Sequence, residues 1–241
     1  MPPEPRISDE IISHAVPTDE DLFAQLSASA LLEDVGKGRR GATLTKPDAA
    51  GHVPLVRTTT RYGSPTQRFR PIHDRLAQRI QARAGLSNAF NNALLEVYTN
   101  AYATMGSHSD QALDLAADSF IAVFSCYQHP EAAPPRRLVF EPKGPGEKFE
   151  IPLAHNSFVA FSLATNRRLK HKIVLDTSAH ATENHWLGVT FRTSKTLLQF
   201  HTGHPHLPQG TPSPRPTTIN SASSTNSAAA RTTSRTSATH H

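Results

Sequence analysis

Short hydrophobic runs dominate the middle of the chain, and turn-forming residues separate them. The runs are rich in Val, Ile and Phe, and turn sequences such as KGPGE, AHN and ATNRR stand between them. Roughly eight short strands at about ten-residue spacing are typical of an all-β sandwich or a jelly roll. We expect strands over residues 90–98, 119–127, 136–141, 148–153, 157–163, 170–176, 185–192 and 196–200.

Two stretches ahead of these strands have a helical pattern. In RFRPIHDRLAQRIQARAG, the residues Ile72, Leu76 and Ile80 recur every four positions, a proline stands in the first turn, and Gly85 follows the last turn. This pattern predicts an amphipathic helix that packs against the sheet. A second helix is expected over residues 18–33, where a threonine precedes three acidic residues.

Composition divides the 241-residue chain into three parts. Residues 1–52 read as an acidic segment followed by a basic linker, GKGRRGATLTKPDAAGHVP, and we expect this part to be partly disordered. Residues 53–201 carry the strands and form the folded domain. Residues 202–241 contain Ser, Thr and Pro but no Asp, Glu or Lys, which predicts a disordered tail.

The folded part is basic. The chain has a formal net charge of +5, and its first 34 residues are acidic, so the positive charge lies further along. A basic domain suggests a polyanionic partner, although many basic domains bind none.

Cysteine content and hydropathy limit the compartment. The only cysteine, Cys126, lies within the apolar run SFIAVFSCY, so an internal disulfide and a cysteine metal cluster are excluded. No apolar stretch is long enough to span a membrane, and no signal peptide is visible at the N-terminus. We expect an intracellular protein of the nucleus or cytoplasm that is not secreted, does not bind membranes, and is a monomer.

A candidate metal site begins at MGSHSD. His108 and Asp110 are two residues apart, so in an extended segment both side chains point to the same side. Such a pair alone also fits an ordinary polar turn. His171, at the start of a later strand, is the preferred third ligand, and two histidines with one carboxylate suit Fe(II) with open positions for a co-substrate and O2. Rival third ligands are His129, His155, His180 and His185.

A co-substrate anchor is expected 21 residues after His171. Arg192 ends an apolar strand and offers a permanently charged fork for the far carboxylate of a dicarboxylate. The hydroxyl of Tyr98 or Thr190 can add a hydrogen bond to the same group. A surface salt bridge is the simpler alternative for Arg192.

Four segments in order resemble the AlkB-like 2-oxoglutarate- and Fe(II)-dependent dioxygenases, over about residues 53–193. PLVRTTTRYGSPTQRF is similar to the substrate-lid segment of that family, and FNNALLEVYTNAYATMGSHSD to its strand followed by His-x-Asp. LKHKIVL resembles the region of the distal histidine, and WLGVTFR the closing strand with its arginine. The spacings between Tyr98, His108, His171 and Arg192 are 10, 63 and 21 residues.

The resemblance implies a mainly β fold with flanking helices (α+β), a double-stranded β-helix or jelly roll. It implies an oxidoreductase that uses Fe(II), 2-oxoglutarate and O2. His108, Asp110 and His171 would hold the iron, and Arg192, Tyr98 and Thr190 the co-substrate. The implied reaction is hydroxylation of an N-methyl group on a nucleic-acid base, with release of formaldehyde, as in DNA repair or RNA demethylation.

The sequence departs from the family pattern inside the expected co-substrate pocket. Glu96 stands where the family has asparagine, Trp186 where it has a first arginine, and Gly188 where it has a second asparagine. The pocket is therefore rebuilt. Two alternatives follow: the same chemistry on a protein or small molecule, and a non-catalytic binding module on the same fold.

The expected substrate contacts lie in the lid segment, residues 57–70. Seven arginines occur between positions 57 and 83, with aromatic residues among them. Arg57, Arg61 and Tyr62 are the predicted contacts, because arginines suit phosphates and an aromatic ring suits a base taken out of its stack. A solvated charged surface is the plainer interpretation of the same run.

Overall fold

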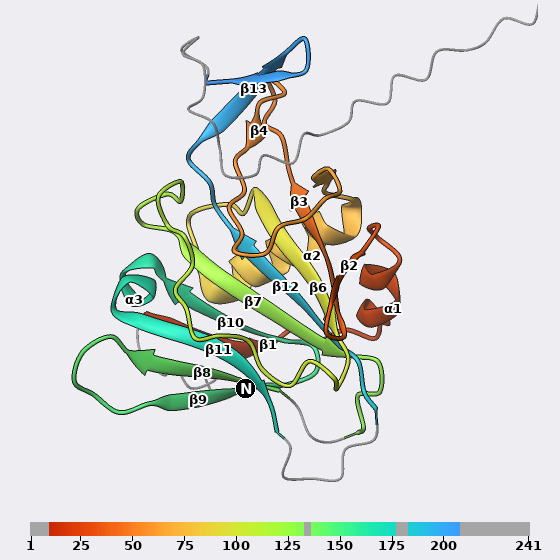
Figure 1. The fold of residues 1–241 in the computed structure, drawn as a ribbon, viewed down its shortest axis with the longest axis vertical. Coiled ribbons are helices and arrows are strands. Elements are labelled where there is room, and N and C mark those ends of the chain that lie inside the picture. The colour runs from red at the N-terminus through yellow and green to blue at the C-terminus, as the bar shows by residue number, and fades with distance from the viewer. Residues whose placement is uncertain (1–9, 133–135, 177–182, 208–241) are drawn as a thin grey trace, which may run out of the picture.

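The computed structural model describes residues 10–132, 136–176 and 183–207, and its elements are two packed β-sheets, a small outlying sheet and three helices (Figure 1). The main sheet contains β1 (Ile11–Ala15), β2 (Glu33–Gly36), β3 (Arg39–Thr45), β5 (Gln67–Arg68), β6 (Asn92–Tyr98), β7 (Phe120–Tyr127), β10 (Ser157–Ser162) and β12 (Trp186–Arg192). The second sheet contains β8 (Arg136–Pro142), β9 (Phe149–Leu153) and β11 (Leu169–Leu175). The outlying sheet contains β4 (Val53–Pro54), β13 (Leu197–His201) and β14 (His204–His206). The helices are α1 (Leu22–Ser27), α2 (Pro71–Ala84) and α3 (Leu163–Arg168).

The strand order of the main sheet is β1-β10-β7-β12-β6-β3-β2, and β5 adds to β3 in parallel. All other pairings in this sheet are antiparallel. The second sheet has the order β11-β8-β9 and is also antiparallel. The mainly β jelly-roll fold expected from the sequence is confirmed, and the strands predicted between residues 90 and 201 are all present.

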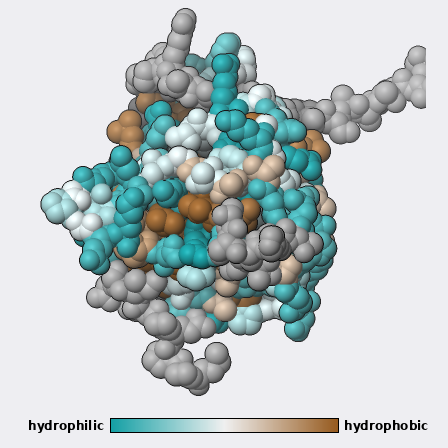
Figure 2. All heavy atoms as spheres, turned by 60° about the horizontal axis from the view of Figure 1, so that its bottom comes forward, coloured by the Kyte–Doolittle hydropathy of each residue, from teal (hydrophilic) through white to brown (hydrophobic). Residues whose placement is uncertain are grey.

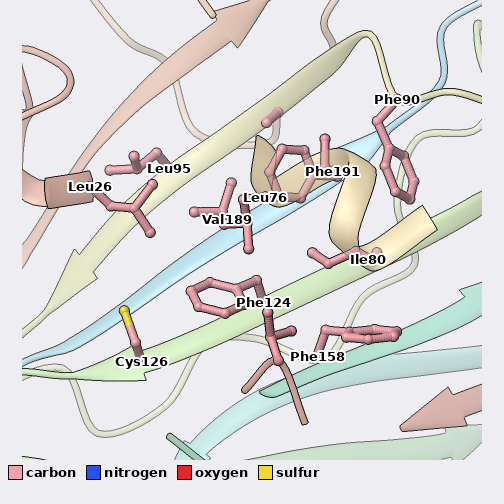
Figure 3. Packing of buried hydrophobic residues seen from close by; sticks show 14 of the residues in the cluster. Leu26, Leu76, Ile80, Phe90, Leu95, Phe124, Cys126, Phe158, Val189 and Phe191 are labelled. Carbon is pink, nitrogen blue, oxygen red and sulfur yellow. The ribbon is translucent and has the colours of Figure 1, made fainter. Parts of the chain in front are cut away.

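The two faces of the main sheet have different partners. Alternate residues of a strand point to opposite faces, so β12 sends Leu187, Val189 and Phe191 to one side. On this side they pack with Leu76 and Ile80 of α2, and Figure 3 shows the aliphatic and phenylalanine side chains of this core. The helical face therefore carries a continuous hydrophobic core that holds the sheet in shape.

The opposite face of the main sheet lies against the second sheet. Val123 and Tyr127 of β7 and Trp186 of β12 form a second buried cluster with Leu138 of β8 and Ile173 of β11. Here the space between the sheets also contains polar residues, which are described below. Cys126 lies on the helical face and is fully buried, as expected of a core thiol.

The N-terminal part differs from the prediction. The predicted domain start at residue 53 and the predicted partly disordered segment with a linker do not match the structure, because β1 pairs with β10 and β3 pairs with β6 along seven residues. Residues 10–45 therefore belong to the main sheet. The helix expected over residues 18–33 is only α1, which Asp21 caps by accepting a hydrogen bond from the Ala24 amide.

The helix α2 agrees with the sequence pattern. It begins with Pro71, ends at Gly85 in a left-handed conformation with φ of 65°, and buries Leu76 and Ile80. Its N-terminus is held by His73, whose ring accepts a hydrogen bond from the Arg70 amide at 2.9 Å. A proline start and a glycine end are the expected punctuation of an amphipathic helix.

The C-terminal part is described only to residue 207. The strand β13 pairs with β14 and with β4, so residues 204–206 extend the fold beyond the predicted limit at residue 201. The rest of the predicted disordered tail, residues 208–241, lies outside the described residues.

The face of the molecule seen in Figure 2 is mainly polar. Figure 2, which turns the lower end of Figure 1 toward the viewer, shows hydrophilic residues over most of this face and hydrophobic residues in small groups. None of the helices in the described part is long and apolar enough to cross a membrane.

Candidate functional site

Three potential metal ligands meet between the two sheets. One nitrogen each of His108 and His171 and one carboxylate oxygen of Asp110 lie within 4.8 Å of one another. Asp110 Oδ1 is 3.6 Å from His108 Nε2 and 3.7 Å from His171 Nε2. His108 is 29% exposed, whereas the other two are below 10%, so the cluster opens to solvent at one side only.

A two-way backbone contact brings the histidines together. The His108 amide donates to the His171 carbonyl at 3.0 Å, and the His171 amide donates to the His108 carbonyl at 2.6 Å. This antiparallel bridge adds the segment before β7 to the edge strand β11. It explains how residues 63 positions apart in the sequence share one site.

Asn166 holds the backbone of Asp110. The Asn166 amide group accepts from the Asp110 N–H at 2.9 Å and donates to the Asp110 carbonyl at 2.9 Å. Asn166 lies in α3, just before β11, and is buried. The sequence analysis missed this residue, because nothing in its local sequence distinguishes it from an ordinary helix residue.

The protonation states suit metal binding. Burial would raise the pKa of Asp110, but the nearby Arg192 charge and the hydrogen bond with His108 outweigh it and hold that pKa far below its usual value. Burial lowers the pKa of His171 to about 4, so its imidazole is neutral at pH 7. Metals bind the ionised carboxylate and the neutral imidazole.

The two ring nitrogens of His108 face different groups. Its Nδ1 is 2.9 Å from the Gly106 carbonyl oxygen, which can only accept a hydrogen bond. The Nδ1 atom must therefore carry the proton of the neutral ring, which leaves the Nε2 lone pair directed toward Asp110 and His171. The hydrogen bond with Asp110, in turn, raises the pKa of His108 more than burial lowers it.

Arg192 lies beside the metal ligands. Its Nε and Nη2 atoms both lie 2.6 Å from Asp110 Oδ2, and its Nη1 is buried without a hydrogen-bond partner in the described structure. The prediction placed Arg192 at the far end of a co-substrate, whereas its position beside Asp110 is at the metal end. The free Nη1 atom is a buried donor that a ligand carboxylate would satisfy.

A cavity of about 310 Å³ extends from the metal ligands into the space between the sheets. Val123, Leu138 and Ile173 give it apolar walls, and Thr190 lies on the same face of β12 as Arg192. Glu96 and Arg39 also line it. Thr190, predicted to hydrogen-bond the co-substrate, is among the residues that line the cavity.

The wall behind the cavity is closed by aromatic rings. Tyr98 is fully buried and donates its hydroxyl to Glu96 at 2.8 Å, and its ring lies 4.8 Å from that of Trp186. A side chain at Gly188 would overlap the Trp186 ring. The Tyr98 hydroxyl, predicted to contact a co-substrate, donates to Glu96 in this structure.

The predicted lid residues lie in three different environments. Arg57 lines the cavity and forms an ion pair with Asp114. Arg61 is exposed but does not line the cavity. Tyr62 is only 2% exposed and donates to Glu96 at 3.3 Å, so its ring has no free face for a base. The proposed stacking role of Tyr62 does not suit this position, because its ring is buried against Gly41 of β3 and its hydroxyl binds Glu96.

The rival histidines do not join the ligand cluster. Among the described residues, His129, His155 and His185 lie outside the single group of three that could hold a metal. His180 lies outside the described residues. The structure therefore favours His171 as the partner of the His108–Asp110 pair.

Solved structures with the same architecture complete this description. The structure reported as that of OsALKBH1 matches with a TM-score of 0.52 and 12% sequence identity, over 79% of this chain and 100% of that chain. The chain therefore shares its overall fold with that structure. A Pseudomonas putida prolyl-4-hydroxylase also matches, with a TM-score of 0.46 and 15% identity over 76% of this chain and 92% of that chain.

Sequence comparison adds no closer relative. No protein-family model matches the chain, and no curated protein matches it. The similarity to known proteins therefore lies in the fold.

Proposed function

We propose that the protein is an Fe(II)- and 2-oxoglutarate-dependent dioxygenase. The observation that carries this proposal is the convergence of His108, Asp110 and His171 within 4.8 Å at the opening of a cavity between the two sheets of this fold. Two imidazoles and one carboxylate are a ligand set that leaves sites open on Fe(II). When bound, Fe(II) supplies the chemistry that couples O2-dependent decarboxylation of 2-oxoglutarate to hydroxylation of a substrate.

The chain's own residues support this chemistry in three ways. Arg192 fixes the orientation of Asp110 and offers its free Nη1 to a carboxylate of the co-substrate. The apolar side chains of Val123, Leu138 and Ile173 keep the inner cavity poor in water. The exposed edge of His108 leaves one side of the site accessible to a substrate.

Nucleic acid with an alkylated base is the proposed substrate, and oxidative removal of an N-methyl group with release of formaldehyde is the proposed reaction. The support is the resemblance of the four sequence segments, the net charge of +5, and the position of Arg57 on the cavity wall. Electrostatic attraction to phosphates makes such binding weaken steeply as salt rises. If a labelled oligonucleotide fails to bind even at low salt concentration, a protein or small-molecule substrate becomes the better proposal.

Turnover tests the proposal directly. We expect the purified chain with Fe(II), ascorbate and 2-oxoglutarate to release succinate, and formaldehyde when a methylated oligonucleotide is added. His171→Ala removes one ligand and is expected to reduce succinate release to the level without protein. His201→Ala, at an exposed position of β13, is the matched control. Full activity of His171→Ala would contradict the assigned metal site.

A second candidate is a binding module without turnover. The observation that favours it is the ring of Trp186, which covers Gly188 on the wall where the family resemblance places co-substrate contacts. This candidate predicts that the chain binds a divalent metal and nucleic acid but releases no succinate with any substrate.

A further inference from the structure

An ion pair lines the cavity on the side of β3 and β6. Arg39 of β3 and Glu96 of β6 both line it, and Arg39 Nε lies 3.6 Å from Glu96 Oε1. Their side chains are 15% and 9% exposed. Glu96 also accepts hydrogen bonds from the hydroxyls of Tyr98, at 2.8 Å, and Tyr62, at 3.3 Å. The fold thus already builds a buried place for one carboxylate, formed by two hydroxyls and a guanidinium.

The carboxylate-binding place at Glu96 is displaced along the strands of the main sheet from Arg192, which lies beside the metal ligands. Arg192 and Gly188 lie on the same face of β12, and Gly188 is paired with Glu96 across to β6. Four residues of a strand correspond to about 13 Å between Cα atoms. Burial raises the pKa of Glu96, and the charges of Arg39 and Arg192 act in the opposite direction, so both arginines interact with this carboxylate. Arg39 and Arg192 therefore offer two separate positive charges to a ligand with an acid group at each end.

The charges of the cavity match a dianion. Arg192 is paired with Asp110, Arg39 with Glu96, and Arg57 with Asp114, so these groups cancel one another. A divalent metal ion would leave two positive charges in a poorly solvated space. Because unbalanced charge is costly there, a dicarboxylate fits the cavity better than a monocarboxylate.

The arginines that line the cavity differ in how free they are to bind the far carboxylate of a dicarboxylate ligand. Arg192 is held at the metal end by two contacts with Asp110, and Arg57 is held by Asp114. Trp186 and Gly188 bring no charge to the wall of β12. Arg39 donates to the hydroxyls of Tyr102 and Thr60 and keeps its Nε toward Glu96. Of the arginines that line the cavity, Arg39 is the one on β3, beside Glu96 and away from Asp110 and Asp114.

We propose that Arg39 binds the far carboxylate of the dicarboxylate co-substrate, and that Glu96 occupies this position when no ligand is bound. This inference rests on the proposed function and names the residue that selects a dicarboxylate over a shorter 2-oxo acid. The cation comes from β3, in the N-terminal part of the sheet. Glu96 acts as a competitor, because its carboxylate and that of the ligand meet the same guanidinium.

Two substitutions are expected to act in opposite directions. Arg39→Gln removes the cation, so 2-oxoglutarate should bind at least about tenfold more weakly, while 2-oxobutanoate, which has no far carboxylate, should bind as before. Glu96→Gln keeps the shape and removes the competing charge, so 2-oxoglutarate should bind more tightly by about tenfold. A general loss of stability would weaken binding in both variants.

The experiment is a titration that needs no turnover. The full chain is loaded with Mn(II), and 2-oxoglutarate and 2-oxobutanoate are added while heat release or the fluorescence of the only tryptophan is measured. Arg40→Gln is the matched control, since Arg40 neighbours Arg39 on β3 but is exposed and outside the cavity lining. Thermal unfolding of each variant shows whether it is folded.

The outcomes separate this inference from the proposed function. If the wild-type chain binds Mn(II) but not 2-oxoglutarate, the co-substrate and this inference both fail. If the wild-type chain binds 2-oxoglutarate and Arg39→Gln binds it equally well, or loses both 2-oxo acids alike, only the role of Arg39 is overturned. If Glu96→Gln is folded and binds 2-oxoglutarate more weakly, the competing role of Glu96 is overturned.

Discussion

Asp110 shows how single residues make the site. One oxygen of its carboxylate faces the two histidines, and the other accepts from Arg192. Its backbone is held separately by Asn166. The side chain is thus oriented by an ion pair and its position by two amide hydrogen bonds, so the ligand geometry exists before any metal binds.

Asn166 provides the first prediction at this scale. Asn166→Ala removes both hydrogen bonds to the Asp110 backbone, and we expect the affinity for Mn(II) or Fe(II) to fall by about 10- to 100-fold, as for other groups that orient metal ligands. Anaerobic metal titration measures this. Asn184→Ala is the control, because Asn184 makes the same reciprocal pair of bonds to the backbone of His129, which is not a ligand. Equal metal affinities in the two variants would remove Asn166 from the site.

At the scale of elements, the hairpin β2–β3 explains why the sequence pattern predicts a linker where the structure has a strand. The turn between these strands is Lys37-Gly38, and both residues have positive φ angles, of 57° and 74°. Two such residues form the tight turn that suits the twist of a hairpin. The same glycine and basic residues are also typical of a flexible linker. Only the pairing of β3 with β6 distinguishes the hairpin from a linker.

The N-terminus of α2 carries a pH-sensitive contact. His73 is fully buried, and its two ring nitrogens lie 2.9 Å from the Arg70 amide and 2.7 Å from the Ser29 hydroxyl. The Arg70 amide needs an acceptor, so the folded protein requires the neutral ring. Burial, with the Arg70 charge, lowers the pKa of His73 from 6.5 to about 4.

This contact predicts a loss of stability in mild acid. The unfolded chain takes up a proton at His73 below pH 6.5, whereas the folded chain does so only near pH 4. Protonation of His73 therefore does not affect stability above pH 6.5, and it destabilises the folded state increasingly as the pH falls from 6.5 to 4. The loss is roughly 2–4 kcal/mol in the free energy of unfolding. Urea unfolding at pH 7 and pH 4.5 measures it in the metal-free protein.

A variant separates His73 from the other histidines. His73→Gln does not titrate, so its stability should depend less steeply on pH than that of the wild type, even if it is less stable at pH 7. His201→Gln, at an exposed position, should keep the wild-type slope. The same slope in all three proteins would show that His73 does not titrate across this interval.

At the scale of the whole molecule, the main sheet separates stability from chemistry. Its helical face carries the large hydrophobic core with α1 and α2 (Figures 1 and 3). Its other face lines the cavity, across which the metal ligands lie. The ligand-bearing strand β11 belongs to the second sheet, whereas Arg192 belongs to the first. The site therefore forms only when both sheets are packed together.

Truncation tests the unity of this domain. A chain that starts at residue 53 lacks β1, α1, β2 and β3, which exposes the edges of β10 and β6 and removes Leu22, Leu26 and Leu44 from the core. We expect it to lose cooperative thermal unfolding and to aggregate. A chain that ends at residue 207 is the control, and it should unfold as the full chain does. Cooperative unfolding of the shorter N-terminal truncation would show that residues 10–52 are dispensable.

The sequence by itself determined the strands from β6 to β13, the helix α2 and the three candidate ligands, because these depend on local periodicity and on residue types with few alternative roles. Tertiary structure alone decided the membership of β1 to β3 in the main sheet, the burial of Tyr62, and the contact of Arg192 with Asp110. It also brought Arg39 and Glu96 to one cavity and Asn166 to Asp110. These contacts join residues that are far apart in the chain. Sheet pairing and side-chain packing determine them, so no local sequence pattern predicts them.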